Sequence, residues 1–289
     1  MTDAPIYIHA GAHRTGTSSF QLCLHENRQV LDDLGWTTAY PGRDGIPSGK
    51  LALRLPSGTR IDAEAAATKA RAAFDSYRDG RPVILSEENI TGRMYHFMQG
   101  LFYPFAEARC AALRAAWTGP IVHLIFVVRP YEELFVSAYR KRAEDNAMPA
   151  FDEVRDHYMN MDRGWPELIA GMYEALRPQT MTVVPYASRG SNVDLLHRLV
   201  PDVPRAVLKE PARVVNKSAT DAALEVLQAR YQNGETLSRA AWTAIIDAHS
   251  DDRAPRGVAQ FSDAEKTEMT ARYASDLKQI EWMPHITLV

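Results

Sequence analysis

The sequence predicts an α/β fold: a three-layer sandwich with a mainly parallel central sheet, followed by a helical C-terminal region. Short apolar segments of strand length alternate with longer segments of helical spacing, a pattern typical of parallel sheets with right-handed crossovers. The first apolar segment leads through a glycine-containing loop directly into a helical segment. The chain has 289 residues, 46 % of them apolar, so we expect a single domain spanning residues 1–289.

Four segments have the length and apolar character of buried strands. The clearest reads IVHLIFVV, at residues 121–128. Ligands of parallel sheets bind at the carboxyl ends of strands, so the residues after each strand are the candidates for function. The predicted strands are Ile6–Ala10, Pro82–Ser86, Ile121–Val128 and Met181–Pro185.

The remaining segments are mostly helical in pattern. Apolar residues such as Phe20, Leu24 and Leu31 recur at helical spacing in the first of them, and Gly35 follows as a C-cap. The Gly-, Pro- and Ser-rich stretch Arg43–Thr59 predicts an irregular loop. The predicted helices are Thr17–Leu34, Ala63–Tyr77, Tyr103–Trp117, Pro130–Asn146, Trp165–Leu176, Val193–Leu199, Thr220–Tyr231, Ser238–His249 and Ser262–Ile280, the last three forming the helical region at about 218–289.

Charge and cysteine content narrow the functional classes. The net charge of −3 gives no electrostatic reason to expect nucleic acid or an anionic membrane as a partner. Cys23 and Cys110 form neither a disulfide framework nor a zinc-binding spacing, and we expect no metal.

No apolar stretch approaches the ~18 residues of a membrane span and no signal peptide is recognisable, so we expect a cytoplasmic protein. The sequence indicates no oligomeric state.

The loop Gly11–Ser19 joins the first strand to the first helix and has the features of an anion site. Gly11 and Gly16 permit tight backbone turns, and the amides at a helix N-terminus attract negative charge. The spacing matches the nucleotide P-loop, GxxxxGK[ST], with Ser18 at the last position. Thr17 stands where the P-loop lysine is required, which weakens an ATPase or GTPase interpretation. The nearest cation is Arg14.

The loop resembles the 5'-phosphosulfate loop of the sulfotransferases that use 3'-phosphoadenosine-5'-phosphosulfate, in particular their bacterial, carbohydrate-type branch. The residues His9–Gln21 carry the resemblance here; it spans about Ile6 to Ile280, is strongest at the two phosphate motifs, and implies a P-loop-type sandwich. It assigns Arg14, Thr15, Gly16, Thr17 and Ser18 to the donor nucleotide. Arg14 stands where that family usually has a lysine that contacts the leaving oxygen, so Arg14 is expected to be catalytic as well as donor-binding. An arginine keeps the positive charge and can donate hydrogen bonds to two oxygens at once, but it does not transfer a proton to the leaving oxygen.

The resemblance extends to two further segments. In the family, an arginine at a strand end and a serine eight residues later hold the 3'-phosphate of the donor, and Arg129 and Ser137 have this spacing. The segment Arg213–Ser218 resembles one that closes over the nucleotide, and it adds Lys217, with Arg213 as an alternative, to the 3'-phosphate site. Ser218 is expected to cap the following helix.

The acceptor hydroxyl must lose its proton during transfer, so a base is expected near the donor. Glu87 and Glu88 follow the strand PVILS at the edge where the donor is expected to bind. Glu87 is our choice of catalytic base and Glu88 the runner-up. His13 is a further alternative, whereas His9, within an apolar strand, is expected to be a buried core histidine.

The function that we expect is transfer of a sulfuryl group from 3'-phosphoadenosine-5'-phosphosulfate to a hydroxyl or amine of a small molecule or saccharide, such as a carbohydrate or glycolipid. One alternative is an ATP-dependent small-molecule kinase with Glu87 in the Walker-B role, against which Thr17 argues. Another is a non-catalytic protein that binds the same nucleotide.

Overall fold

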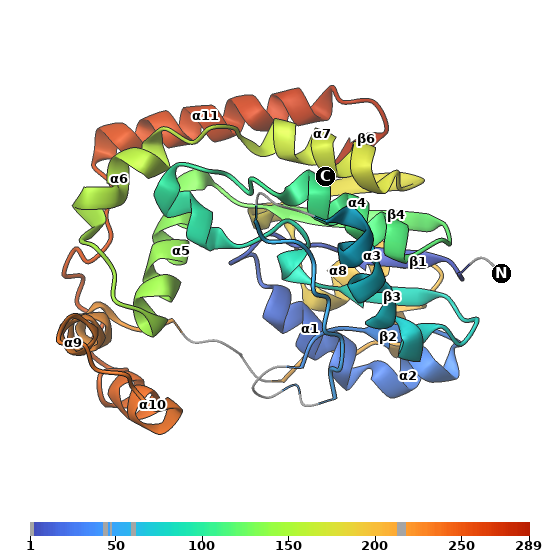
Figure 1. The fold of residues 1–289 in the computed structure, drawn as a ribbon, viewed down its shortest axis with the longest axis horizontal. Coiled ribbons are helices and arrows are strands. Elements are labelled where there is room, and N and C mark those ends of the chain that lie inside the picture. The colour runs from blue at the N-terminus through green and yellow to red at the C-terminus, as the bar shows by residue number, and fades with distance from the viewer. Residues whose placement is uncertain (1–2, 43–45, 47, 59–61, 213–217) are drawn as a thin grey trace.

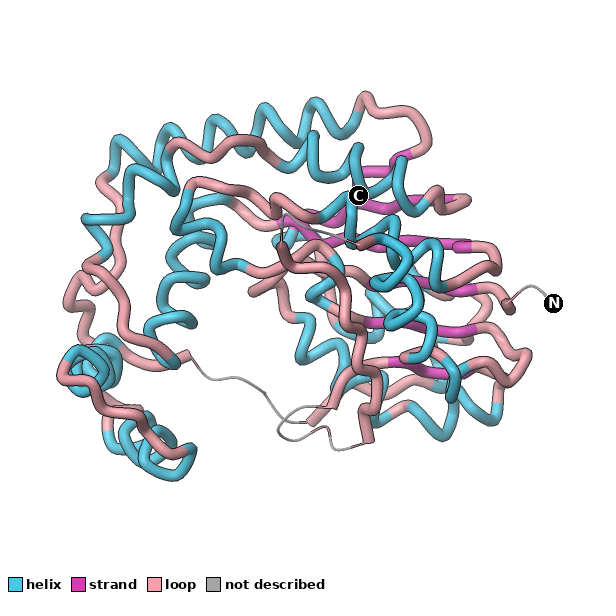
Figure 2. Tube along the Cα trace, viewed as in Figure 1, coloured by secondary structure: helices cyan, strands magenta, loops and turns pink. Residues whose placement is uncertain are grey.

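The computed structural model describes residues 3–42, 46, 48–58, 62–212 and 218–289. Within them, six strands form one sheet with every pair parallel, in the order β2-β3-β1-β4-β5-β6 (Figures 1 and 2). The order reverses at β1, which lies between β3 and β4, so the carboxyl end of β1 is where a ligand is expected. The strands are β1 Ile6–His9, β2 Thr37–Ala39, β3 Val83–Ser86, β4 Ile121–Val128, β5 Thr180–Pro185 and β6 Ile286–Leu288.

Helices cover both faces of this sheet, which confirms the predicted three-layer α/β sandwich. Side chains of β4 alternate between two apolar cores: Leu124 and Phe126 face one, and Ile125 faces the other. The first core includes residues of α3, α4, α5, α7 and α11, and the second includes residues of α1, α2 and α8. The helices are α1 Thr17–Glu26, α2 Arg28–Asp33, α3 Ala63–Ala72, α4 Ala106–Ala116, α5 Tyr131–Asp145, α6 Phe151–Met159, α7 Trp165–Leu176, α8 Asn192–Leu199, α9 Asp221–Gln232, α10 Arg239–Ala248 and α11 Asp263–Glu281.

The prediction of one helix over Thr17–Leu34 is wrong, because the chain turns at Asn27 between α1 and α2. The Asn27 side chain is buried. Its amide donates to the carbonyl of Lys209 at 2.8 Å, and its oxygen accepts from the Lys209 amide at 2.8 Å. Asn27 therefore pairs with a distant segment at the point where the helix is interrupted.

Other differences concern short elements and helix ends. The edge strands β2 and β6 and the helix α6 were not predicted. The helix predicted from Tyr103 begins only at Ala106, since Tyr103 has a left-handed backbone with φ 51°. The helix predicted to reach Tyr77 ends at Ala72 and continues as a separate 3₁₀ turn. Part of the predicted loop 43–59 lies outside the described residues.

The C-terminal region is helical, as predicted, but its helices pack in two places. Helix α11 contacts α5, α7 and β6, while α9 and α10 pack against each other beside α5 (Figure 1). No helix in the described residues is long and apolar enough to cross a bilayer.

A buried polar contact attaches α11 to the helices α5 and α7. The Tyr131 hydroxyl at the start of α5 donates to the carboxylate of Asp276 in α11 and accepts from the Trp165 amide at 2.8 Å. Asp276 is only 6 % exposed, and its burial raises its pKa. The hydroxyl is therefore one of the groups that solvate a carboxylate removed from water.

Replacing Tyr131 with phenylalanine should lower the free energy of unfolding by about 1–3 kcal/mol, because a buried carboxylate loses a donor. Urea unfolding measures the change. Tyr273→Phe is the matched control: its hydroxyl is buried without a hydrogen-bond partner in the described chain, so its removal should cost little. Equal losses for both variants would contradict the role of the Asp276 contact.

Candidate functional site

The loop after β1 has the tight geometry that its glycines predict. Gly16 adopts φ 84° and is the N-cap of α1, so no side chain caps the first turn of that helix. A Cβ on Gly11 would lie 2.8 Å from the Thr17 hydroxyl oxygen, so a side chain there would force Thr17 to shift. Thr15 is buried, and its hydroxyl donates to the Ala12 carbonyl at 2.5 Å. The Thr15 side chain thus supports the loop, while the first amides of α1 have no acceptor within the helix.

Arg14 connects this loop to helix α5. Its Nε donates to the Ser137 hydroxyl at 2.8 Å, and its Nη2 donates to the Ser218 hydroxyl at 3.3 Å. Arg129 in turn donates to the Arg14 carbonyl at 2.6 Å. The structure therefore brings together Arg14, Arg129 and Ser137, which the sequence placed in two separate anion-binding elements.

The Arg129 side chain also makes contacts on its own side of the site. Its Nε lies 3.0 Å from a carboxylate oxygen of Glu133, one helical turn later, and its guanidinium lies 4.9 Å from the centre of the Tyr186 ring. Glu133 is largely exposed, so the pair contributes little to stability. These contacts fix the direction of the guanidinium beside the loop.

A cavity of about 460 Å³ lies over the first turn of α1. The described residues that line it carry four permanent cations, Arg14, Arg129, Lys141 and Arg189, against the single carboxylate of Glu88. Burial lowers the pKa of Arg14; the charge of Glu144 opposes this shift, and the charge of Arg129 adds to it. An anion would relieve this clustering of positive charge, so the cavity is suited to an anionic ligand.

Sequence reasoning missed Arg189 and Lys141. Arg189 follows β5 at the same sheet edge; its guanidinium carbon would lie 3.3 Å from a Cβ on Gly16, and its buried Nε has no partner in the described chain. Lys141 lies one turn after Ser137 on the same face of α5. Inspection of every strand end, and of the position four residues after Ser137, would have found both.

The adjacent residues Glu87 and Glu88 lie in different environments. Glu87 is 4 % exposed and caps the 3₁₀ turn η2, Glu88–Ile90: its carboxylate accepts from the Asn89 amide at 2.9 Å and from the Asn89 side chain at 2.8 Å. Glu87 is not among the described residues that line the cavity, whereas Glu88 is. The geometry thus favours the runner-up, Glu88, as the carboxylate that reaches a ligand.

The two histidines near the loop also differ. His9 is buried, as expected, and its Nδ1 lies 3.0 Å from the Ser86 hydroxyl. Burial, assisted by the charge of Arg189, lowers the pKa of His9 to about 3, so its ring is neutral. His13 lines the cavity, and its Nε2 lies 3.3 Å from the Asn89 side-chain oxygen.

A second cavity, of about 500 Å³, adjoins the first. His13, Glu88 and Met94 line both cavities, so they form the boundary between them. We name the first the loop cavity and the second the adjacent cavity. Two neighbouring cavities that share a carboxylate and an imidazole can hold two reactants with a proton acceptor between them.

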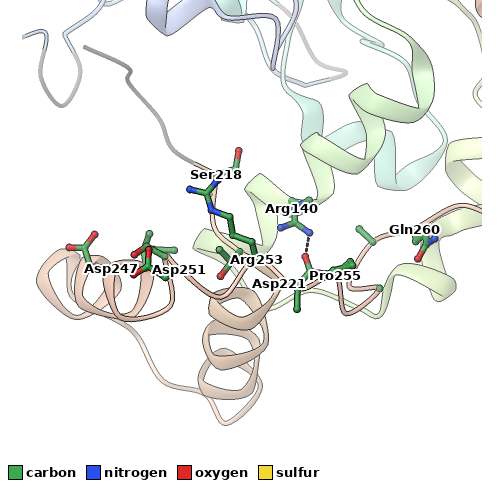
Figure 3. Close-up of a pocket in the computed structure, with 14 residues that line it drawn as sticks. Arg140, Ser218, Asp221, Asp247, Asp251, Arg253, Pro255 and Gln260 are labelled. Carbon is green, nitrogen blue, oxygen red and sulfur yellow. Dashed lines mark hydrogen bonds and ion pairs between the residues drawn. The ribbon is translucent and has the colours of Figure 1, made fainter. Parts of the chain in front are cut away.

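A larger hollow of about 820 Å³ lies beside α9, α10 and α5 (Figure 3). Its inner polar groups pair with one another: Arg140 is ion-paired with Asp221 and donates to the Ala219 carbonyl at 2.8 Å. Most other residues of its lining are exposed, as are Asp247, Asp251 and Arg253. This arrangement accounts for its polar groups without a ligand.

Lys217, predicted to contact the 3'-phosphate, lies outside the described residues, as does Arg213. Ser218 lines the loop cavity, and the N-cap of α9 is Thr220 rather than Ser218. In the described residues, no group of three or more His, Cys, Asp or Glu side chains is placed to hold a metal.

Comparison of the chain with known proteins gave no match, either to a protein-family model or to a curated protein. The functional interpretation therefore depends on the site itself.

His9 makes the stability of the fold sensitive to acid. Its pKa is lowered in the folded state, so its contribution is complete above the ordinary pKa of 6.5 and is lost as the pH falls toward about 3. Between pH 7 and pH 5 the protein should lose about 2 kcal/mol through this group. The variant His9→Asn retains a polar atom near Ser86 but binds no proton. Urea unfolding at both pH values should show a smaller decrease for this variant; equal decreases would contradict the assignment.

Proposed function

We propose that this protein binds 3'-phosphoadenosine-5'-phosphosulfate in the loop cavity and transfers its sulfuryl group to an acceptor in the adjacent cavity. The observation that carries the proposal is the hydrogen bond from Arg14 to Ser137. It joins the loop after β1 to the element after β4, so that two anion-binding elements border one cationic cavity. A nucleotide with phosphate groups at both its 5' and 3' positions needs two such elements close together.

In the proposed complex, the first amides of α1 and the Thr17 and Ser18 residues bind the 5'-phosphosulfate beside Arg14. Arg129 and Ser137 bind the 3'-phosphate. Each charge-assisted hydrogen bond of this kind contributes about 1.5–3 kcal/mol. The role of Lys217 at the 3'-phosphate stays a prediction. Arg189, whose buried Nε lacks a partner in the described chain, is an additional donor to the bound anion.

The transfer itself requires one bond to form and one to break. The acceptor oxygen bonds to sulfur while the bond from sulfur to the 5'-phosphate oxygen breaks, and the hydroxyl proton passes to Glu88. The products are a sulfate ester and adenosine 3',5'-bisphosphate. Glu88 is proposed as the base in place of Glu87 because it borders both cavities; His13 is the alternative. Arg14 stabilises the charge that develops on the leaving phosphate without donating a proton.

A cytoplasmic location is part of the proposal. Cys23 and Cys110 are separate buried thiols, and burial raises the pKa of each to about 12, which keeps them protonated. Unpaired cysteines are typical of reducing compartments.

Nucleotide binding tests the proposal directly. Adenosine 3',5'-bisphosphate at about 100 times its dissociation constant should stabilise the protein by about 2.7 kcal/mol in a thermal unfolding assay, whereas ATP with Mg²⁺ should have a smaller effect. Stabilisation by ATP alone would favour the kinase alternative. Binding of the bisphosphate without turnover of any acceptor would favour the non-catalytic alternative.

Two glycines offer matched variants for this assay. Gly16 and Gly35 have nearly equal φ angles of 84° and 83°, so alanine strains the backbone similarly at both. Only the Gly16 Cβ would meet the Arg189 guanidinium, at 3.3 Å; nothing lies within 4 Å at Gly35. Gly16→Ala should weaken bisphosphate binding at least 10-fold, while Gly35→Ala should retain the affinity. Equal affinities would place the nucleotide elsewhere.

The two glutamates are distinguished by turnover, measured as bisphosphate release with a panel of saccharide acceptors. Glu88→Gln should lower kcat about 10²- to 10⁴-fold, because the base is lost, and should leave bisphosphate affinity unchanged. Glu87→Gln retains an oxygen acceptor for Asn89 and should have a small effect. The opposite result would return the catalytic role to Glu87.

A further inference from the structure

The adjacent cavity is basic in a way that the transfer reaction does not require. Arg93, which precedes the 3₁₀ helix η3 (Met94–Gln99), and Arg142 of α5 line it together with Tyr95 and His96 of η3. Glu88, at the boundary with the loop cavity, is the only carboxylate among its described lining residues. The two arginines therefore outnumber the acidic groups that face them.

Arg142 has the environment of a binding group rather than of a structural one. Its guanidinium lies 5.4 Å from the centre of the Tyr95 ring, and its Nε is buried without a hydrogen-bond partner in the described chain. Arg140, two residues earlier on the same helix, is by contrast ion-paired with Asp221. Within the described residues, neither Arg93 nor Arg142 has a carboxylate partner. A buried N–H group without a hydrogen-bond partner is stabilised when a ligand supplies an acceptor.

We infer that the acceptor is an acidic saccharide, whose carboxylate or sulfate group binds Arg142 and Arg93. This inference rests on the proposed function, in which the adjacent cavity holds the acceptor. The carboxylate of Glu88 repels the acidic group of the saccharide and accepts a hydrogen bond from one of its hydroxyls. The two arginines attract the acidic group and hold it through charge-assisted bonds. Opposite preferences at two places in one cavity orient the acceptor with its hydroxyl toward Glu88.

Calorimetric titration with three saccharides tests this inference without requiring turnover. The probes are p-nitrophenyl β-D-glucuronide, p-nitrophenyl β-D-glucoside and the 6-O-sulfated form of that glucoside. They share a ring and an aglycone and differ in the group at one carbon. At least one acidic probe should bind 10-fold or more tightly than the neutral glucoside, and the difference should shrink as salt concentration rises. The two acidic probes distinguish a carboxylate site from a sulfate site.

Variants of three arginines test whether Arg142 and Arg93 cause the preference for an acidic saccharide. Arg142→Gln and Arg93→Gln should each reduce the preference for the acidic probe at least 5-fold. Arg93 is exposed, so its replacement does not disturb the core. Arg230→Gln is the control, because it removes the same charge from an exposed position on α9 that lines neither cavity. It should retain the full preference.

Failure of this inference is distinguishable from failure of the proposed function. Equal binding of neutral and acidic probes, no binding of any probe, or an unchanged preference in both Arg142→Gln and Arg93→Gln would overturn the inference. If the bisphosphate still binds in those cases, the proposed donor site stands. Preferential binding of an acidic probe by a protein that does not bind the bisphosphate would support the anion site and contradict the donor assignment.

Discussion

The candidate site depends on one residue, Arg14, whose backbone carbonyl and guanidinium are both held by hydrogen bonds. Its backbone is left-handed, with φ 65°, which costs a non-glycine residue about 1–2 kcal/mol. Its carbonyl accepts from Arg129 at the end of β4, and its guanidinium donates to Ser137 in α5. These bonds compensate the strain and fix the loop after β1 to the next strand of the sheet. Without them the amides of α1 and the cations of α5 would not border the same cavity.

This arrangement concentrates positive charge before any ligand binds. Burial lowers the pKa of Arg14, and the nearby charge of Arg129 lowers it further. The compensation within the protein is partial: Glu133 pairs with Arg129, Glu144 and Asp145 pair with Lys141, and Asn192 accepts a hydrogen bond from Arg189 but carries no charge. A site organised in this way is poised for an anion, because much of the cost of assembling the cations has already been met by the fold.

The apolar strands were predictable because each reads as a continuous hydrophobic segment, and all four lie within one residue of their predicted positions. The edge strands β2 and β6 have three residues each, too few for a pattern to emerge. The break at Asn27 depends on Lys209, far away in sequence. At the candidate site, glycine spacing singled out Gly16, and the resemblance singled out Arg14 and Ser137, which the structure brings within hydrogen-bond distance of each other. The choice between Glu87 and Glu88 was not, because neighbouring residues point in different directions and only the local turn decides which one faces the cavity.

Asn27 and Arg14 together position Lys209 and Ser218 relative to helix α1. Lys209 is attached through Asn27 to the C-terminal end of α1, and Ser218 is attached through Arg14 to the loop that precedes the same helix. Lys209 and Ser218 are thus attached near opposite ends of the same helix. A ligand that takes the guanidinium of Arg14 away from Ser218 would break this attachment and leave the one between Asn27 and Lys209 in place.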